Sequence, residues 1–265
     1  MIPSRLAPSA KRLATLPRGD GRIELSLQDG FLEVMIDNPT RAGSIDPGMM
    51  LDLCALPQLL LEHSPAAVVV HSSSPVGRAF CAGGDLKSVR THLMRAELAA
   101  DMCDLMTWAL DALASAPCAV IAAVEGPAHG GGAELLTACD FIYGGPLATV
   151  GFVHARLGVS PGWGGGRRLL RRAGRREALW WLTEARAVDV TESRRHGMID
   201  ELVPEGGALA AARAHAQRLT RLPQAALKGA IVLASGGDVS EREIFLSLWG
   251  GPDHTAALAR SQAGR

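Results

Sequence analysis

The sequence predicts an α/β fold with a mostly parallel sheet, followed by a helical C-terminal region. Continuous apolar, β-branched runs are typical of strands buried on both faces, and helical patterns lie between them. From Arg175 onward nearly every segment has apolar residues at helical spacing. We therefore expect an N-terminal extension over residues 1–22, an α/β core over 23–200 and a helical region over 201–265.

The strands are predicted first. Residues 22–37 (RIELSLQDGFLEVMID) alternate apolar and polar side chains around Asp29-Gly30, which indicates a β-hairpin. Residues 66–73 (AAVVVHSS) and 119–126 (AVIAAVEG) are continuous apolar runs, and 141–145 (FIYGG) is a shorter one. These three are expected to be buried strands.

The helices follow from three- and four-residue spacing of apolar side chains. Two are expected in the core, and several more make up the C-terminal part of the chain. Their ranges are 96–114, 134–138, 175–187, 190–198, 207–222 and 240–249.

Composition argues against several classes of partner and of binding site. The 27 Lys and Arg residues balance 27 Asp and Glu, which argues against a nucleic-acid-binding surface. No apolar run reaches membrane-spanning length, so no membrane partner is expected. The five cysteines are widely spaced and form no CxxC, so we expect buried small residues in a reducing compartment, the cytoplasm, and no metal site.

Two basic stretches have more than one interpretation. Residues 1–22 are basic and lack an acid before Asp20, as in an organellar presequence, but Pro3, Pro8 and Pro17 favour an ordinary extension. Residues 164–176 (GGGRRLLRRAGRR) are interpreted as a solvated helix face, with an anion site or subunit contact as the alternative.

Two glycine-rich turns each follow a buried strand and carry the candidate chemistry. They are residues 77–89 (GRAFCAGGDLKSV) and the start of 124–141 (VEGPAHGGGAELLTACDF). A glycine turn that leads into a helix leaves backbone N–H groups unpaired. One amide from each turn could hold an oxygen that becomes negative during reaction, with Glu134 nearby to move a proton.

Four segments resemble the crotonase (enoyl-CoA hydratase/isomerase) superfamily, namely residues 36–46 (IDNPTRAGSID), 77–86 (GRAFCAGGDL), 124–174 and 185–204. The resemblance implies a crotonase-like spiral of ββα units, a helical trimerisation region and acyl-CoA thioester substrates. The expected partner is thus a second and third copy of the chain, as a trimer or a dimer of trimers.

The same resemblance assigns residues to the site. The amides of Gly84 and Gly131 would form the oxyanion hole for a thioester enolate. Backbone near Cys81 and Ala82 would line the adenine and pantetheine path. Asp85 and His129 are further candidate substrate-binding residues.

One position departs from the hydratases of the superfamily, which use two glutamates. Glu134 matches the first, but His154 stands where the second would be. Water addition needs one group to activate water and another to protonate carbon. The broken pair therefore argues against efficient hydration.

Within the superfamily, the segments 48–53 (GMMLDL), 130–141, 152–165 and 248–260 (LWGGPDHTAALAR) resemble members that decarboxylate ethylmalonyl-CoA. We therefore expect a lyase that removes CO2 from a short 2-alkylmalonyl-CoA, either ethylmalonyl- or methylmalonyl-CoA. Loss of CO2 leaves the enolate that the two glycine amides would stabilise. No separate cofactor is expected, because coenzyme A is part of the substrate.

An apolar pocket around the substrate carboxylate would favour its loss. Phe152, Trp163 and Trp249 are candidates for its wall, with plain core packing as the alternative. Glu134 is expected to be protonated there, because burial and a neighbouring like charge disfavour the ionised form, and to deliver the proton to C2. His154 could do so instead, or bind the leaving carboxylate.

Two other functions stay open at this point. One glutamate suffices for some double-bond isomerisations, so an enoyl-CoA hydratase or isomerase is the first alternative. A catalytically silent acyl-CoA-binding homologue is the second, although the intact Glu134 and both glycine turns argue against it.

Overall fold

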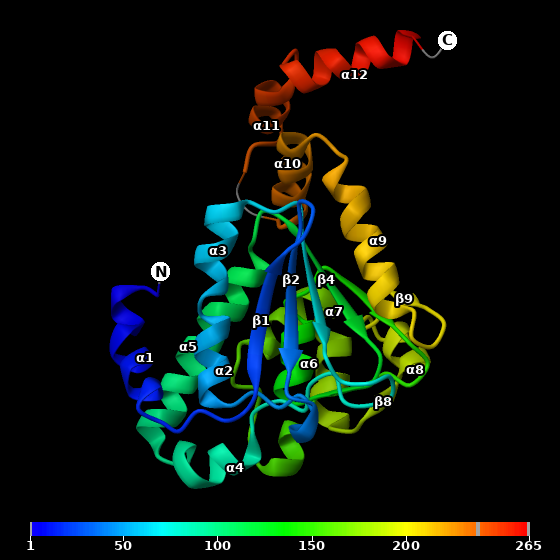
Figure 1. Ribbon diagram of the computed structural model, residues 1–265. Helices are drawn as coiled ribbons and strands as arrows, with labels where there is room; N and C mark the ends of the chain where they lie inside the picture. Colours follow the sequence, from blue (N-terminus) through cyan, green and yellow to red (C-terminus); the bar gives the residue numbers. More distant parts are fainter. Residues whose placement is uncertain (1, 237–238, 264–265) are drawn as a thin grey trace.

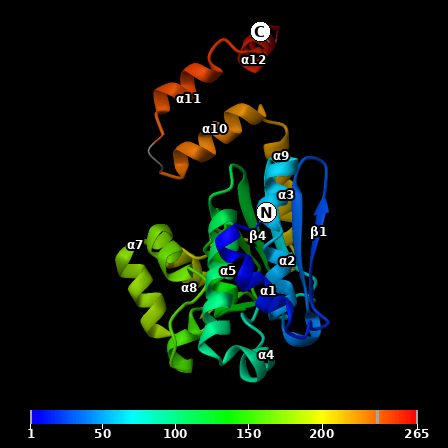
Figure 2. The same cartoon turned by 90° about the vertical axis from the view of Figure 1, so that its left-hand side faces the viewer.

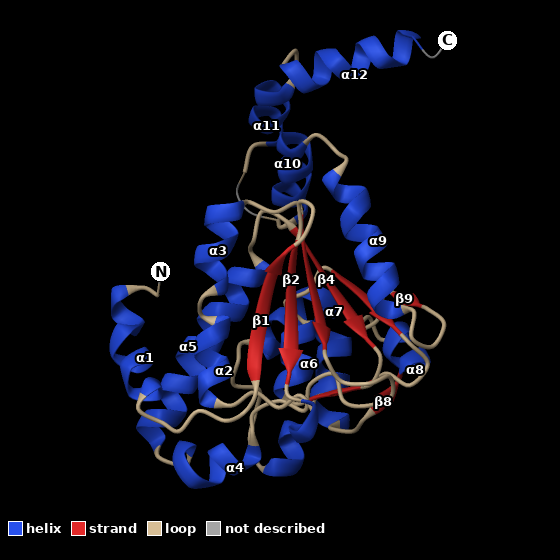
Figure 3. Cartoon of the chain, viewed as in Figure 1, coloured by secondary structure: helices blue, strands red, loops and turns tan. Residues whose placement is uncertain are grey.

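The computed structural model describes residues 2–236 and 239–263 of the chain. Its main sheet has six strands in the order β1-β2-β3-β4-β6-β9, which spread like a fan in Figure 3. Their bounds are β1 Arg22–Leu27, β2 Leu32–Asp37, β3 Ala67–Ser72, β4 Ala119–Val124, β6 Phe141–Gly144 and β9 Glu201–Leu202.

The expected hairpin and parallel sheet are both confirmed. Strands β1 and β2 pair antiparallel, with Arg22 opposite Asp37, around a turn in which Gly30 has a φ of 87°. A positive φ of this kind is readily adopted by glycine. All other neighbouring pairs of the main sheet are parallel.

The central strands are buried on both faces, as their composition predicts. Successive side chains of a strand point to opposite faces. In β3, Val68 and Val70 belong to the larger apolar core, whereas Ala67 and Val69 belong to a smaller one that includes Ala212 of α9 (Ala208–Thr220).

Helices cover the larger core on the other face of the sheet. They include α1, α2, α3 and α5, which stand together in Figures 1 and 2. Their bounds are α1 Ala7–Ala14, α2 Pro47–Leu53, α3 Leu56–His63 and α5 Ala96–Ala114. Short helical segments η1 (Ser4–Leu6) and η2 (Pro39–Arg41) lie before and between them.

The N-terminal segment is folded onto this face rather than separate from it. Leu13 of α1 is fully buried, and α1 packs against α5 and α2. The Arg12 guanidinium donates two hydrogen bonds of 2.6 Å to Asp101 of α5. Residues up to 22, expected as an extension, therefore contribute a packed helix.

A second, three-stranded sheet positions the glycine triplet. Its order is β5-β7-β8, with β5 Pro127–His129, β7 Thr149–Gly151 and β8 Val188–Asp189. Helix α6 (Gly131–Leu136) begins directly after β5. The helix was expected over 134–138, so its start inside the glycine triplet corrects that range; the flexible glycines form its first turn.

The remaining helical segments surround these sheets. They are α4 Leu86–Ser88, the single π turn η3 Val89–Leu93, η4 Val153–Leu157, α7 Gly165–Glu184 and α8 Val190–Arg195. Helix α7 is interrupted at Gly174, where φ is 78° and ψ is 168°. Its first half carries much of the basic stretch.

The C-terminal helices α10 (Gln224–Ala234), α11 (Glu241–Leu248) and α12 (Pro252–Ala263) extend beyond the end of the main sheet (Figures 1 and 2), and Ile231 of α10 packs against the smaller core. The helical C-terminal region was expected over 201–265; residues 237–238 and 264–265 of that range lie outside the described residues. Among the helices that are described, none combines the length and apolar character needed to cross a membrane.

Candidate active site

The two glycine turns lie against each other. Cys81 forms a parallel bridge with Ala128, and the His129 amide donates to the Cys81 carbonyl at 2.9 Å. A Cβ on Gly83, whose φ is 91°, would lie 2.7 Å from the Gly131 nitrogen. A Cβ on Gly132 would lie 2.0 Å from the Cys81 oxygen. Glycine is therefore required here because backbone meets backbone at contact distance.

This contact brings together the two amides expected in the oxyanion hole. The N–H groups of Gly84 and Gly131 donate no hydrogen bond to any residue that the structure describes. The Trp163 indole covers both positions: a Cβ on Gly131 would lie 2.3 Å from its ring, and one on Gly84 would lie 3.6 Å away. Two unpaired amides and an apolar wall thus occupy one place.

The Glu134 carboxylate lies one helical turn beyond Gly131 and is buried. Its Oε1 accepts hydrogen bonds from the Gly162 amide at 3.2 Å and from the His154 ring at 3.0 Å. Its Oε2 accepts from the amides of Trp163 at 2.8 Å and Gly165 at 2.9 Å. We call these three amides, at the start of α7, the Glu134 clamp.

His154 reaches Glu134 through Nε2, and its side chain is only 12% exposed. The other ring nitrogen, Nδ1, is buried and has no hydrogen-bond partner. Only one other buried side-chain polar atom of the described residues shares this condition, Ser74 Oγ. Buried polar groups are nearly always paired, so an unpaired ring nitrogen beside a carboxylate calls for a chemical explanation.

The clamp is held in place from two sides. Cys103 Sγ on α5 donates to the Gly162 carbonyl at 2.6 Å. Arg168, with a side chain only 1% exposed, donates to the Trp163 carbonyl at 2.7 Å and to the backbone oxygen of Glu134 at 3.3 Å. Asp111 of α5 pairs with Arg168 at 2.7 Å.

Arg168 corrects the interpretation of the basic stretch as a solvated helix face. Its neighbour Arg167 is 65% exposed, as expected, but Arg168 faces the core beside Gly165 and Leu169. That spacing of three and four residues marks the buried side of α7 and was a signal available in the sequence. Burial lowers the pKa of the Arg168 guanidinium, although Asp111 opposes the shift.

Three other expected site residues lie close by, but their side chains are buried or bonded within the protein. Cys81 is buried, and burial raises the pKa of its thiol to about 12. Asp85 caps α4 by accepting from the Ser88 amide at 2.7 Å. His129 pairs with Thr149 Oγ1 at 3.0 Å, and burial lowers the pKa of its ring. Ala82, in contrast, is exposed on the first turn, where a ligand has access to it.

The apolar wall candidates separate into three cases. Trp163 joins the site, as described above. Phe152 is fully buried and packs edge-on against Trp181, with ring centroids 5.9 Å apart, so it is a core residue behind the site. Trp249 is not brought to the site: its ring partners are Phe245 and His254, and α11 leads away from the core.

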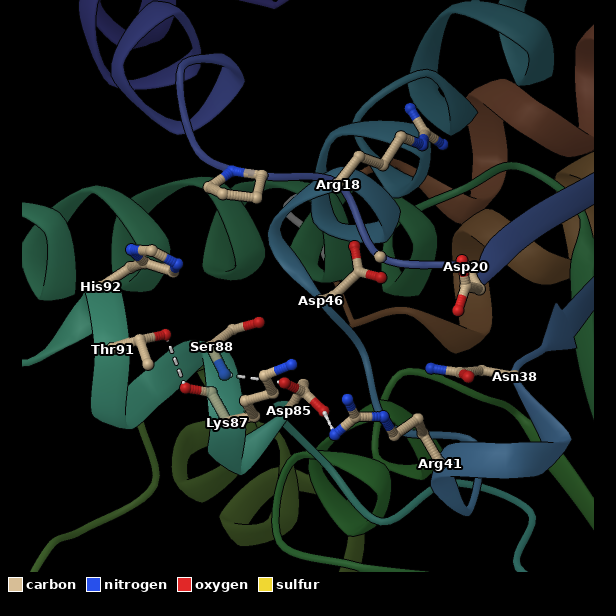
Figure 4. Close-up of a pocket in the computed structure, with 12 residues that line it drawn as sticks. Arg18, Asp20, Asn38, Arg41, Asp46, Asp85, Lys87, Ser88, Thr91 and His92 are labelled. Atoms are coloured by element: carbon tan, nitrogen blue, oxygen red, sulfur yellow. Dashed lines mark hydrogen bonds and ion pairs between the residues drawn. The ribbon is translucent and has the colours of Figure 1, made fainter.

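A cavity of about 430 Å³ opens beside the first glycine turn (Figure 4). Lys87, Ser88, Thr91 and His92 line it on one side, and the segments around Arg18 and Arg41 line it on the other. Arg18 pairs with Asp52, and Arg41 lies 3.4 Å from Asp85. Lys87 and His92 form no ion pair with any described residue. The cavity therefore presents three cations, Arg18, Arg41 and Lys87, together with the carboxylates of Asp20, Asp46 and Asp85.

A family model described as enoyl-CoA hydratase/isomerase matches residues 26–234. The ethylmalonyl-CoA decarboxylase of Danio rerio is 34% identical over 94% of this chain and 86% of its own. That of Xenopus laevis is 32% identical over 91% of this chain and 83% of its own.

Among solved structures, the enoyl-CoA hydratase of Bacillus anthracis superposes with a TM-score of 0.84. It covers 92% of this chain and 97% of its own, at 23% sequence identity. This similarity confirms the predicted crotonase-like α/β fold.

Proposed function

This chain belongs to the enoyl-CoA hydratase/isomerase family, and we propose that it is an acyl-CoA-processing lyase that decarboxylates a short 2-alkylmalonyl-CoA. The observation that carries the proposal is the similarity to ethylmalonyl-CoA decarboxylases along 94% of the chain. A hydratase is less well supported, because His154 replaces the second glutamate of the usual pair.

The chemistry needs an electron sink and a dry site. The bond between C2 and the carboxylate breaks, CO2 leaves, and the bonding pair enters the thioester carbonyl as an enolate. The free amides of Gly84 and Gly131 are placed to donate to that oxygen, and donors aimed at a developing charge are a major source of rate. Trp163 excludes water beside them, which favours loss of the charged carboxylate.

Coenzyme A supplies the thioester and needs no further cofactor in this scheme. Its phosphates are anionic, and among the cations that line the cavity of Figure 4, Lys87 has no described ionic partner, whereas Arg18 and Arg41 pair with Asp52 and Asp85. Exposed Ala82 adjoins the glycine triplet, since its oxygen would be 3.8 Å from a Cβ on Gly130. We place the nucleotide end of the substrate in the cavity and the acyl end at Gly84 and Gly131.

The active form is proposed to be a trimer or a dimer of trimers. Helices α10 to α12 leave the core and expose Phe245, Leu246 and Trp249. Exposed apolar patches of this kind mark contact surfaces. Another copy of the chain is the proposed occupant.

A panel of acyl-CoA thioesters followed by mass spectrometry tests the proposal. Ethylmalonyl- and methylmalonyl-CoA are expected to lose the mass of CO2. A gain of the mass of water on crotonyl-CoA, without CO2 loss from the malonyl thioesters, would establish hydration instead. Binding without any mass change would establish the silent acyl-CoA-binding alternative.

A further inference from the structure

The contacts of Glu134 bear on which group carries the proton. An ionised carboxylate has two oxygens that only accept hydrogen bonds. In Glu134 each oxygen already accepts two, from the three clamp amides and the His154 ring. Three of these four partners are backbone amides, which can only donate, so they match an ionised carboxylate better than a carboxylic acid. The positive end of α7, from which the clamp comes, also favours an anion there.

His154 has the complementary arrangement. When Glu134 is ionised, Nε2 is the nitrogen that donates to it. The ring's remaining nitrogen, Nδ1, then points away from Glu134 and is paired with nothing. Val153, the preceding residue, would lie 4.0 Å from a Cβ on Gly130, so this segment adjoins the glycine triplet.

We infer that His154, acting from Nδ1, delivers the proton to C2 of the enolate, and that Glu134 is the fixed anion that orients and stabilises the protonated ring. This inference rests on the proposed decarboxylation. Of the two donors that the sequence left open, it selects His154 over a protonated Glu134. The orphan Nδ1 is explained, because its partner is supplied by the reacting substrate.

The step is balanced without another reactant. After CO2 leaves, the proton on Nδ1 of the imidazolium moves to C2 and the enolate pair forms the new C–H bond. The thioester carbonyl is restored. The neutral ring keeps its Nε2 hydrogen and its bond to Glu134, and a proton from solvent returns to Nδ1.

His154→Gln separates the two roles of the ring. Glutamine can place an amide N–H near the position of Nε2, which preserves the donor to Glu134, but it has no acid that corresponds to Nδ1. His63→Gln is the matched control, because His63 is exposed on α3. Glu134→Gln completes the set of variants. The side-chain NH2 of glutamine is itself a donor, so it cannot accept hydrogen bonds from the clamp amides or the His154 ring.

The readout is the configuration of C2 after decarboxylation of fresh ethylmalonyl-CoA in D2O. Wild type and His63→Gln are expected to give one enantiomer of 2-deuteriobutyryl-CoA. His154→Gln is expected to release CO2 and give a near-equal mixture, because solvent deuterates the free enolate from either face. A single enantiomer from His154→Gln, with a mixture from Glu134→Gln, would overturn the inference.

A second substrate keeps the inference testable if ethylmalonyl-CoA is not decarboxylated. Butyryl-CoA has no carboxylate to lose, so deuterium exchange at its C2 needs only the oxyanion hole and a proton carrier. Exchange by wild type that disappears in His154→Gln supports the role of His154, whatever happens to the malonyl thioester. Equal exchange by both proteins, or none by wild type, counts against it.

Discussion

Gly131 and Gly84 are assigned the same chemical role, yet their surroundings differ. A Cβ on Gly131 would lie 2.3 Å from the Trp163 ring, whereas one on Gly84 would make an ordinary contact of 3.6 Å. Gly131→Ala should therefore displace Trp163 or its own amide and lower turnover by about a hundredfold or more, the usual loss for one oxyanion-hole donor. Gly84→Ala should cost far less.

Steady-state turnover of the two variants checks this prediction, with circular dichroism to establish that both fold. Overpacking a core costs about 1–3 kcal/mol, which a folded protein of this size can tolerate. A Gly131→Ala protein that is folded and fully active would contradict the placement of Trp163 over the oxyanion hole.

At the level of single residues, the sequence predicted which groups lie together better than which hydrogen bonds they make. Glu134, His154, Trp163 and the two glycines are chemically distinctive and lie in recognisable turns. The hydrogen bonds of Glu134 were not predictable, because its clamp amides come from residues 28 to 31 positions further along the chain. Backbone donors have no signature in residue type, so only folding shows where they point.

Helices α5, α6 and α7 meet at Arg168, and this meeting point should matter for stability. Arg168 joins Asp111 of α5 to Thr137 Oγ1 after α6 and to the Trp163 carbonyl before α7. Asp111 is 36% exposed and keeps Arg167 as a partner, but the backbone carbonyls of Trp163 and Glu134 would lose a buried donor. Arg168→Met should therefore lower the free energy of unfolding by about 1–3 kcal/mol.

Arg167→Met is the matched control, because Arg167 also pairs with Asp111, at 3.0 Å, but is 65% exposed. Exposed pairs contribute about 0–1 kcal/mol, so this variant should unfold within about 1 kcal/mol of wild type. Urea unfolding of both proteins gives the comparison. Equal stability of the two variants would show that Arg168 is not a structural junction.

A second junction, between α9 and the sheet, should make stability depend on pH. Glu33 of β2 accepts from Arg213 of α9 at 2.6 Å and 3.0 Å, and this pairing lowers the pKa of the Glu33 carboxyl below its ordinary 4.5. His71 lies 3.7 Å from Glu33, and burial lowers the pKa of its ring.

Both pKa shifts make the folded protein less stable in acid. A group whose pKa is lower in the folded than in the unfolded state stabilises the fold above its unfolded pKa, and this stability is lost on acidification. Wild type should therefore lose stability from the histidine range downward and further below pH 4.5. Glu33→Gln should remove the loss of stability that occurs below pH 4.5. This loss is of order 1 kcal/mol, because Arg213 is half-exposed. Urea unfolding from pH 7 to 3 measures it; parallel curves would contradict this account.

At the level of helices and strands, the sequence predicted an element where a single pattern of residues determined it. The strands β3 and β4 have continuous apolar runs because helices cover both faces of the sheet, and the hairpin has alternation and a turn. The start of α6 was not predictable, since glycines in a helix oppose propensity and are fixed here by contact with Cys81 and Gly83. Likewise the burial of Arg168 depends on Asp111, which is 57 residues away.

Across the whole molecule, the core covers its apolar residues, whereas the C-terminal helices leave several of theirs exposed. The core encloses its own in two clusters on the faces of the main sheet. Helices α10 to α12 instead form an open apolar cavity of about 330 Å³, lined by Phe245, Leu248 and Trp249 among others. The sequence shows that these helices are apolar on one side, but not that a single chain leaves that side uncovered.

Trp249 is one of the apolar residues that the C-terminal region leaves exposed. As part of a motif it was expected at the substrate, but within one chain it directly follows α11, a helix that lies beyond the end of the main sheet (Figure 1). Its side chain is 63% exposed and packs only on Phe245 and His254 among the described rings. An indole so exposed is best explained by contact with another copy of the chain.

This explanation predicts the assembly and the means to break it. Light scattering of wild type should give three times the chain mass or a multiple of it. Trp249→Glu should shift the protein toward monomers, because a carboxylate cannot be buried against an apolar partner surface without a large desolvation cost. The same charge at Leu61, 75% exposed on α3, should leave the assembly unchanged. A wild-type monomer, or a Trp249→Glu protein that assembles as wild type does, would show that the C-terminal helices serve another purpose.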